Sequence, residues 1–142
     1  MGWLATRAPD LMERWLAFKD YTTICHSAPS EALALMALRA KEAILSRNLN
    51  IIQANLAQAE SFFAEYPALF EWLKPGGGSI AFPAWTGPGS VEAFCQAVLD
   101  GQGVMIVPGS IFDYRGNYFR LGLGRRNFPE ALGRVRRHLL AV

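Results

Sequence analysis

The sequence has little charge, few cysteines and no long apolar run, and each of these absences narrows its possible roles. Its 142 residues carry a net charge of only +2, which argues against nucleic-acid binding. Cys25 and Cys95 are too few for a disulfide scaffold, so we expect buried free thiols in a reducing compartment. No apolar run approaches the roughly 20 residues of a transmembrane helix, and no signal-peptide region follows Met1. We therefore expect a cytoplasmic protein that contacts neither nucleic acid nor a membrane.

The common catalytic and metal-binding signatures are absent as well. The sequence has no Gly-x-Ser-x-Gly nucleophile motif and no phosphate-binding loop. His26 and His138 lie far apart and lack metal-ligand spacing, so we expect no metal site. The lysines are Lys19, Lys41 and Lys74, and solvent exposure is the usual state of lysines at such helix and turn positions.

What the sequence does contain is the composition and periodicity of a globular protein. Apolar residues make up 51% of the chain and charged residues 18%, as in ordinary folded domains. Residues 2–5 predict a short buried strand, and Pro9 opens a helix. From Ser30 to Tyr66 nearly every residue favours helix, and we expect two helices that break near Ala40. One helical face is apolar throughout, with Leu45, Leu49, Ile52, Leu56 and Phe63.

The rest of the chain alternates strands and helices. Strands are predicted over residues 79–82, 104–107 and 118–123, and Ser90 caps a helix that ends near Asp100. A final helix begins at Asn127, where Glu130 lies three residues on, as in a capping box. This order predicts an α/β protein, a small-domain α/β sandwich. A small, largely antiparallel sheet packs on helices and is preceded by a long interdomain helical segment.

Arg120 is the charged residue inside the last predicted strand. It lies between Phe119 and Leu121, and strand alternation places it on the face opposite both. An arginine that faces inward must be paired with an anion. From the spacing alone, a structural ion pair, a solvent-facing arginine and a ligand-binding arginine all remain open.

Four segments, taken in order, carry a family resemblance. They are Gly2-Trp3-Leu4-Ala5, residues 21–31, residues 74–83 (KPGGGSIAFP), and residues 103–110 (GVMIVPGS) with 116–122 (GNYFRLG). Together they resemble the C-terminal part of the class I/II (fold type I) pyridoxal-phosphate-dependent aminotransferases. In that family a G-V-x-V-x-P-G strand leads to a strand that carries an arginine, and a Gly-Trp strand follows the cofactor lysine.

The resemblance implies a division of the chain into three parts. Residues 1–20 correspond to the last strand and helix of an otherwise missing large domain, residues 21–66 to the interdomain helices, and residues 67–142 to the C-terminal small domain. The Schiff-base lysine and the residues that hold the cofactor ring come earlier in the family. We therefore expect a C-terminal fragment that lacks the catalytic lysine and is inactive alone.

The resemblance also implies a function for the parent protein. Arg120 corresponds to the arginine that binds the substrate α-carboxylate. The parent is expected to use pyridoxal 5'-phosphate with amino-acid and 2-oxo-acid substrates and to form a homodimer, whereas this chain alone binds no cofactor. Two alternatives stay open: an aminotransferase-like effector domain of a transcriptional regulator, and a stand-alone amino-acid-binding module.

Overall fold

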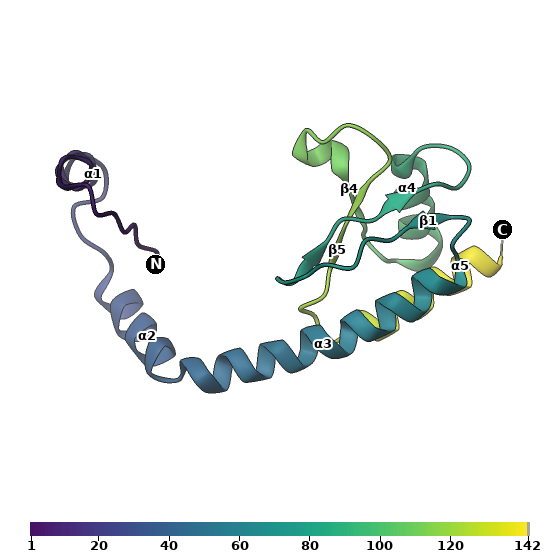
Figure 1. Ribbon diagram of the computed structural model, residues 1–142, viewed down its shortest axis with the longest axis horizontal. Helices are drawn as coiled ribbons and strands as arrows, with labels where there is room; N and C mark the ends of the chain where they lie inside the picture. The colour runs from purple at the N-terminus through teal and green to yellow at the C-terminus, as the bar shows by residue number, and fades with distance from the viewer. Residues whose placement is uncertain (142) are drawn as a thin grey trace. The chain divides into compact units, whose positions relative to one another are not determined.

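The computed structural model describes residues 1–141, so Val142 lies outside the described residues. The chain divides into two compact units, Met1–Leu45 and Ser46–Val142 (Figure 1). The boundary falls within one long helix. The predicted division at residues 20 and 66 stays a prediction.

The N-terminal unit contains two helices and the first turn of a third, which continues into the C-terminal unit. Helix α1 spans Pro9–Thr22, α2 spans Ala28–Arg39, and the long helix α3 spans Lys41–Glu65. Ala40 is the C-cap of α2 and immediately precedes α3, which confirms the predicted break. Neither α1 nor α2 contains a buried residue.

The expected buried strand at residues 2–5 is wrong. These residues form no strand and are exposed, Trp3 at 74%. The physical reason is that a strand needs a partner for its backbone N–H and C=O groups. None of the described residues pairs with this segment, so its backbone stays irregular.

The C-terminal unit contains five short strands. Strands β2, β5 and β4 form one antiparallel sheet in that order, and β1 pairs with β3 in a second, smaller one. This confirms the expected α/β small domain with a small antiparallel sheet. The bounds are β1 Phe70–Glu71, β2 Ile80–Ala81, β3 Ala84–Trp85, α4 Val91–Gln102, β4 Val107–Pro108, the 3-10 turn η1 Gly109–Phe112, β5 Phe119–Gly122 and α5 Phe128–Leu140.

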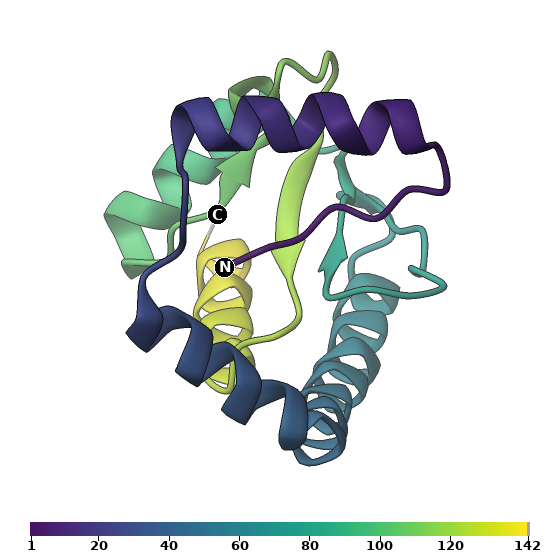
Figure 2. The same ribbon diagram turned by 90° about the vertical axis from the view of Figure 1, so that its left-hand side faces the viewer.

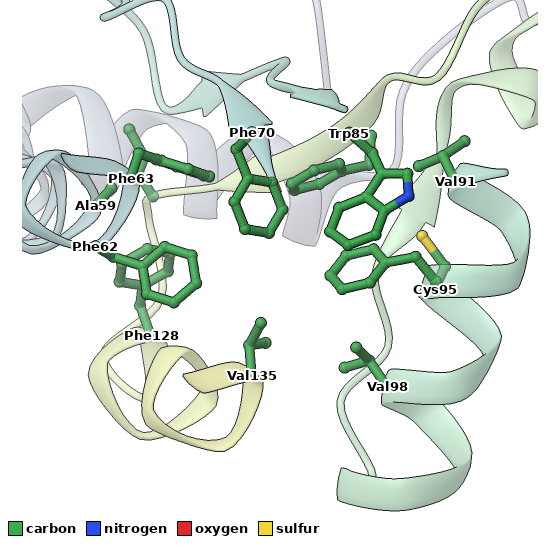
Figure 3. Packing of buried hydrophobic residues seen from close by; sticks show 13 residues of the cluster. Ala59, Phe62, Phe63, Phe70, Trp85, Val91, Cys95, Val98, Phe128 and Val135 are labelled. Atoms are coloured by element: carbon green, nitrogen blue, oxygen red, sulfur yellow. The ribbon is translucent and has the colours of Figure 1, made fainter. Parts of the chain in front are cut away.

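Aromatic residues dominate the core of the C-terminal unit. Figure 3 shows rings from α3, β1, β3 and α4 gathered in one cluster. The Trp85 and Phe94 rings stack with centroids 4.2 Å apart, and the Phe63 ring stacks on Trp72 at 4.5 Å. Such rings dominate core energetics because each buries a large area. The cluster therefore fixes which face of β5 points inward.

Helix α5 packs along the C-terminal half of α3 (Figures 1 and 2), where Arg136 pairs with Glu65 at 3.0 Å. Val135 is buried, and Leu132 and Leu139 pack against the core. The apolar face of α3 is buried only in its C-terminal half, since Leu49 remains 52% exposed.

Helix ends follow the predicted signals in part. The Ser90 side chain accepts a hydrogen bond from the Ala93 amide, and Gly103 closes α4 in the left-handed region, where glycine is favoured. Asn127 occupies the N-cap position of α5 without a side-chain cap bond, so the predicted capping box does not form.

The strand expected at residues 104–107 is displaced to Val107–Pro108. Within the described part of the chain, no helix is long and apolar enough to cross a bilayer.

Candidate functional site

Arg120 lies on β5, opposite Val107 of β4. Phe119 is buried at 3% exposure, whereas Arg120 is exposed, as the expected alternation of the strand requires. Among the described residues the Arg120 guanidinium forms no ion pair and donates to no acceptor. The structural ion pair that the sequence left open is therefore wrong. The Glu92 carboxylate accepts from the Ser110 hydroxyl, and the Asp100 carboxylate accepts from the Gln96 side-chain amide.

The Arg120 side chain borders a hollow of about 420 Å³. Strands β4 and β5 and the start of α5 form its walls, and the lining is largely apolar, including Met105, Leu121 and Phe128. Arg125 contributes a second cation to the same hollow. An exposed guanidinium beside apolar walls suits a ligand that has both a carboxylate group and an apolar hydrocarbon part.

Phe112 of η1 lies against Arg120. The guanidinium carbon is 5.8 Å from the centre of the Phe112 ring, a cation–π distance. The sequence did not predict this contact, because a four-residue 3-10 turn has no periodicity. One indication of an aromatic contact near this turn was present in the sequence: Phe112 and Tyr114 follow shortly after Pro108-Gly109.

Asn55 ties helix α3 to the segment that follows β5. Its side-chain amide donates to the Leu123 carbonyl at 2.8 Å and to the Arg125 carbonyl at 2.7 Å. Asn55 is only 3% exposed. These bonds fix the chain just beyond Arg120. A signal was available, since Asn55 is a polar residue between Ile52 and Leu56 on the apolar face of α3.

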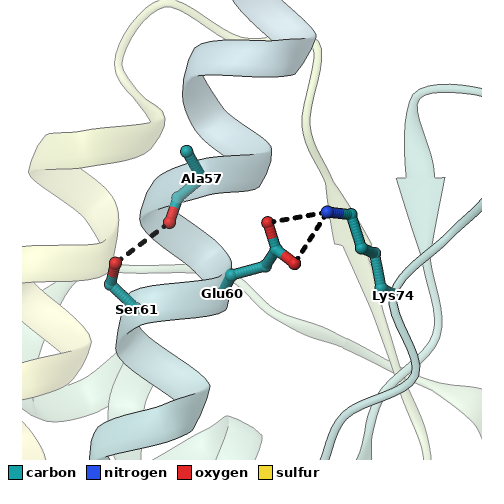
Figure 4. A network of polar contacts seen from close by, with 4 residues as sticks. All are labelled: Ala57, Glu60, Ser61 and Lys74. Atoms are coloured by element: carbon teal, nitrogen blue, oxygen red, sulfur yellow. Dashed lines mark hydrogen bonds and ion pairs between the residues drawn. The ribbon is translucent and has the colours of Figure 1, made fainter.

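The three lysines each make a local contact. The Lys74 ammonium is 2.9 Å from Glu60 (Figure 4), and Lys41 is 3.5 Å from Glu42. The Lys19 ammonium donates to the Ile24 carbonyl at 2.5 Å, where the backbone turns at the end of α1. Each ammonium thus serves a local contact.

A larger hollow, of about 670 Å³, lies in the N-terminal unit, away from Arg120 in sequence. Its walls are mostly apolar side chains of α1 and of the segment before it. We call this the apolar N-terminal surface, and it comprises Trp3, Leu4, Met12, Trp15, Leu16 and Phe18. Its size reflects uncovered apolar side chains, and the polar side chains of Lys19, Thr22, Thr23 and His26 also line it.

The two thiols differ in exposure. Cys95 is buried, and burial raises the pKa of its thiol to about 11. Cys25 is free but exposed, so the expected burial is wrong for this residue. It follows α1 in an irregular segment that no described element covers.

No group of three or more His, Cys, Asp or Glu side chains in residues 1–141 could hold a metal ion.

No family profile matches this sequence. Capreomycidine synthase from Streptomyces vinaceus is 28% identical over 112 residues, which cover 79% of this chain and 28% of the synthase. A PLP-dependent aminotransferase from Streptococcus suis 89-1591 superposes with a TM-score of 0.83 at 29% identity, over 93% of this chain and 35% of its own. The PLP-dependent cyclase OrfR superposes with a TM-score of 0.82 at 28% identity, over 93% of this chain and 37% of its own. The chain therefore spans only about a third of the length of the proteins it matches.

Proposed function

Because this chain has the architecture of the C-terminal small domain of fold type I PLP-dependent aminotransferases, we propose that it is the C-terminal part of an enzyme acting on an α-amino acid. In this proposal Arg120 binds the substrate α-carboxylate and the enzyme transfers the amino group. The observation that carries the proposal is the exposed Arg120 guanidinium, which has no protein acceptor and borders an apolar hollow.

The proposed role of Arg120 is to position the substrate. A guanidinium can donate two parallel hydrogen bonds to a carboxylate, which fixes the plane of that group. Fixing the carboxylate also fixes the direction of the bonds at Cα. Positioning of this kind can lower a reaction barrier by several kcal/mol.

The cofactor would be held by residues other than those of this chain. Pyridoxal phosphate supplies an electron sink for the bonds at Cα when it is bound. The ammonium groups of Lys19, Lys41 and Lys74 all serve local contacts. We therefore expect this chain alone to bind no cofactor and to catalyse no turnover.

Cyclisation is a second candidate reaction. One of the proteins that match this chain at 28% identity is named as a PLP-dependent cyclase. The proposed contact between Arg120 and a carboxylate would serve an amino-acid substrate in either reaction. Incubation of the full enzyme with amino acids separates them, since only amino transfer requires a 2-oxo acid and yields a second amino acid.

We extend the proposal to a cytoplasmic homodimer. The exposed free Cys25 suits a reducing compartment. The apolar N-terminal surface is uncovered within its own unit, and uncovered apolar patches commonly mark interfaces.

Substitution of Arg120 tests the proposed function. Arg120→Ala should change the stability of this chain by less than about 0.5 kcal/mol, because the side chain is exposed and unpaired. In the full enzyme it should raise KM and lower kcat/KM for α-amino acids. Arg120→Lys should rescue only in part, because lysine cannot form the bidentate pair.

Arg126→Ala is the matched control, since Arg126 is also exposed but lies beyond β5. The assignment of Arg120 would be wrong if Arg120→Ala unfolds the chain and leaves amino-acid affinity unchanged. The cofactor expectation has its own test, in which the chain is mixed with pyridoxal phosphate, reduced with borohydride and mapped. A stoichiometric adduct on one lysine, together with amino-acid turnover, would overturn it.

A further inference from the structure

We propose that Phe112 is a positioning residue for Arg120: its ring holds one face of the guanidinium and leaves the N–H edge free for a carboxylate. This inference rests on the proposed function, since it concerns how Arg120 is presented to its ligand. It begins from the cation–π contact of 5.8 Å between the two side chains.

The geometry of a guanidinium separates its two uses. The planar group stacks through its face, whereas it donates hydrogen bonds from its edge. No described residue accepts a hydrogen bond from the Arg120 edge, so the Phe112 ring is the contact through which this long side chain would be restrained. A flexible arginine side chain loses conformational entropy when it binds a carboxylate. An arginine that already contacts an aromatic ring has lost part of that entropy beforehand, so its binding costs less free energy.

The turn that carries Phe112 is firmly fixed to β5. The Gly109 amide donates to the Tyr118 carbonyl at 2.6 Å, and the Tyr114 amide donates back to the Gly109 carbonyl at 3.2 Å. A Cβ atom on Gly109 would lie 2.9 Å from the Phe82 ring and 3.0 Å from the Tyr118 carbonyl oxygen. Only glycine allows this close approach. The base of the turn therefore sits directly beside the strand that holds Arg120.

Two further contacts hold the turn. The Ser110 hydroxyl donates to the Glu92 carboxylate at 2.7 Å, which ties η1 to α4. The Tyr114 ring packs edge-on against both Phe82 and Tyr118, at 5.0 and 5.2 Å. Because η1 is held at both ends, the half-exposed Phe112 side chain projects from a rigid support.

The test compares Phe112→Leu with the native chain by NMR relaxation of the Arg120 Nε–Hε pair. Phe112→Leu removes the aromatic face and keeps an apolar side chain, so the order parameter should fall to below about 0.6, the range of flexible groups. Phe112→Tyr should restore it. Ile111→Ala is the control from the same turn, since Ile111 is 70% exposed, and it should leave the order parameter unchanged.

Titration with acetate, followed at the same Nε–Hε signal, measures how tightly Arg120 binds a carboxylate. Phe112→Leu should weaken acetate binding about two- to fivefold, the factor expected for an exposed cation–π contact, and Phe112→Tyr should recover it. An unchanged order parameter and unchanged acetate affinity in Phe112→Leu would overturn the inference. If acetate fails to shift Arg120 in the native chain while Phe112→Leu still loosens it, the ring contact stands and the proposed carboxylate-binding function fails.

Discussion

Replacing Asn55 by leucine should destabilise the C-terminal unit more than any exposed substitution on the same helix. Leucine has a similar size but cannot donate to the Leu123 and Arg125 carbonyls, which Asn55 binds at 2.8 and 2.7 Å. Leu123 is fully buried, so its carbonyl would be left without a partner at a cost of about 1–3 kcal/mol. The Arg125 carbonyl is nearer to solvent, and losing its bond should cost about 0.5–1.5 kcal/mol.

The expected total is about 2–4 kcal/mol. Urea unfolding, followed by the near-ultraviolet circular dichroism of the aromatic core, measures it. With an m-value of about 1–2 kcal/mol/M for a unit of this size, the midpoint should fall by about 1–4 M urea. The m-value itself should not change, because the same surface becomes exposed on unfolding.

Asn50→Leu provides the matched control. Asn50 lies on the same helix but is exposed, so its substitution should alter stability by less than about 0.5 kcal/mol. Equal midpoints for Asn55→Leu and Asn50→Leu would refute the reasoning, because they would show that the two carbonyls find other partners at no cost.

Four further predictions concern the thiols, the η1 turn and association. Iodoacetamide at pH 8 should label Cys25 and spare Cys95, as peptide mass spectrometry would show; equal labelling would contradict the burial of Cys95. Because the folded pKa of Cys95 is raised to about 11 from 9.0, its contribution to stability should be intact below pH 9.0 and lost as the pH rises through 11, and Cys95→Val should flatten this alkaline decline. The Ser110 hydroxyl lowers the pKa of Glu92, so Ser110→Ala should raise that pKa in a carboxyl-carbon NMR titration, and an unchanged value would exclude the bond. The apolar N-terminal surface should drive self-association, and light scattering that reports a monomer at every concentration would count against it.

Local signals in the sequence determined the helices. The break at Ala40 and the start of α4 at Ser90 follow from periodicity and capping, which act over a few neighbouring residues. The placement of Arg120 and Phe119 on opposite faces follows from strand alternation, whereas the aromatic core decided which of the two is buried. The family resemblance could also be reached from the sequence, because its motifs occur in order along the chain.

Only the tertiary structure decided the short strands and the support of the candidate site. Strands β1 and β3 have two residues each, and their existence depends on pairing with each other. Residues 2–5 have the composition of a strand but no partner, so they form none. Phe112 contacts Arg120 from the neighbouring η1 turn, and Asn55 binds the segment after β5 from a helix about 70 residues away in sequence. No local pattern encodes such contacts, because they depend on how the aromatic core brings α3, η1 and β5 together.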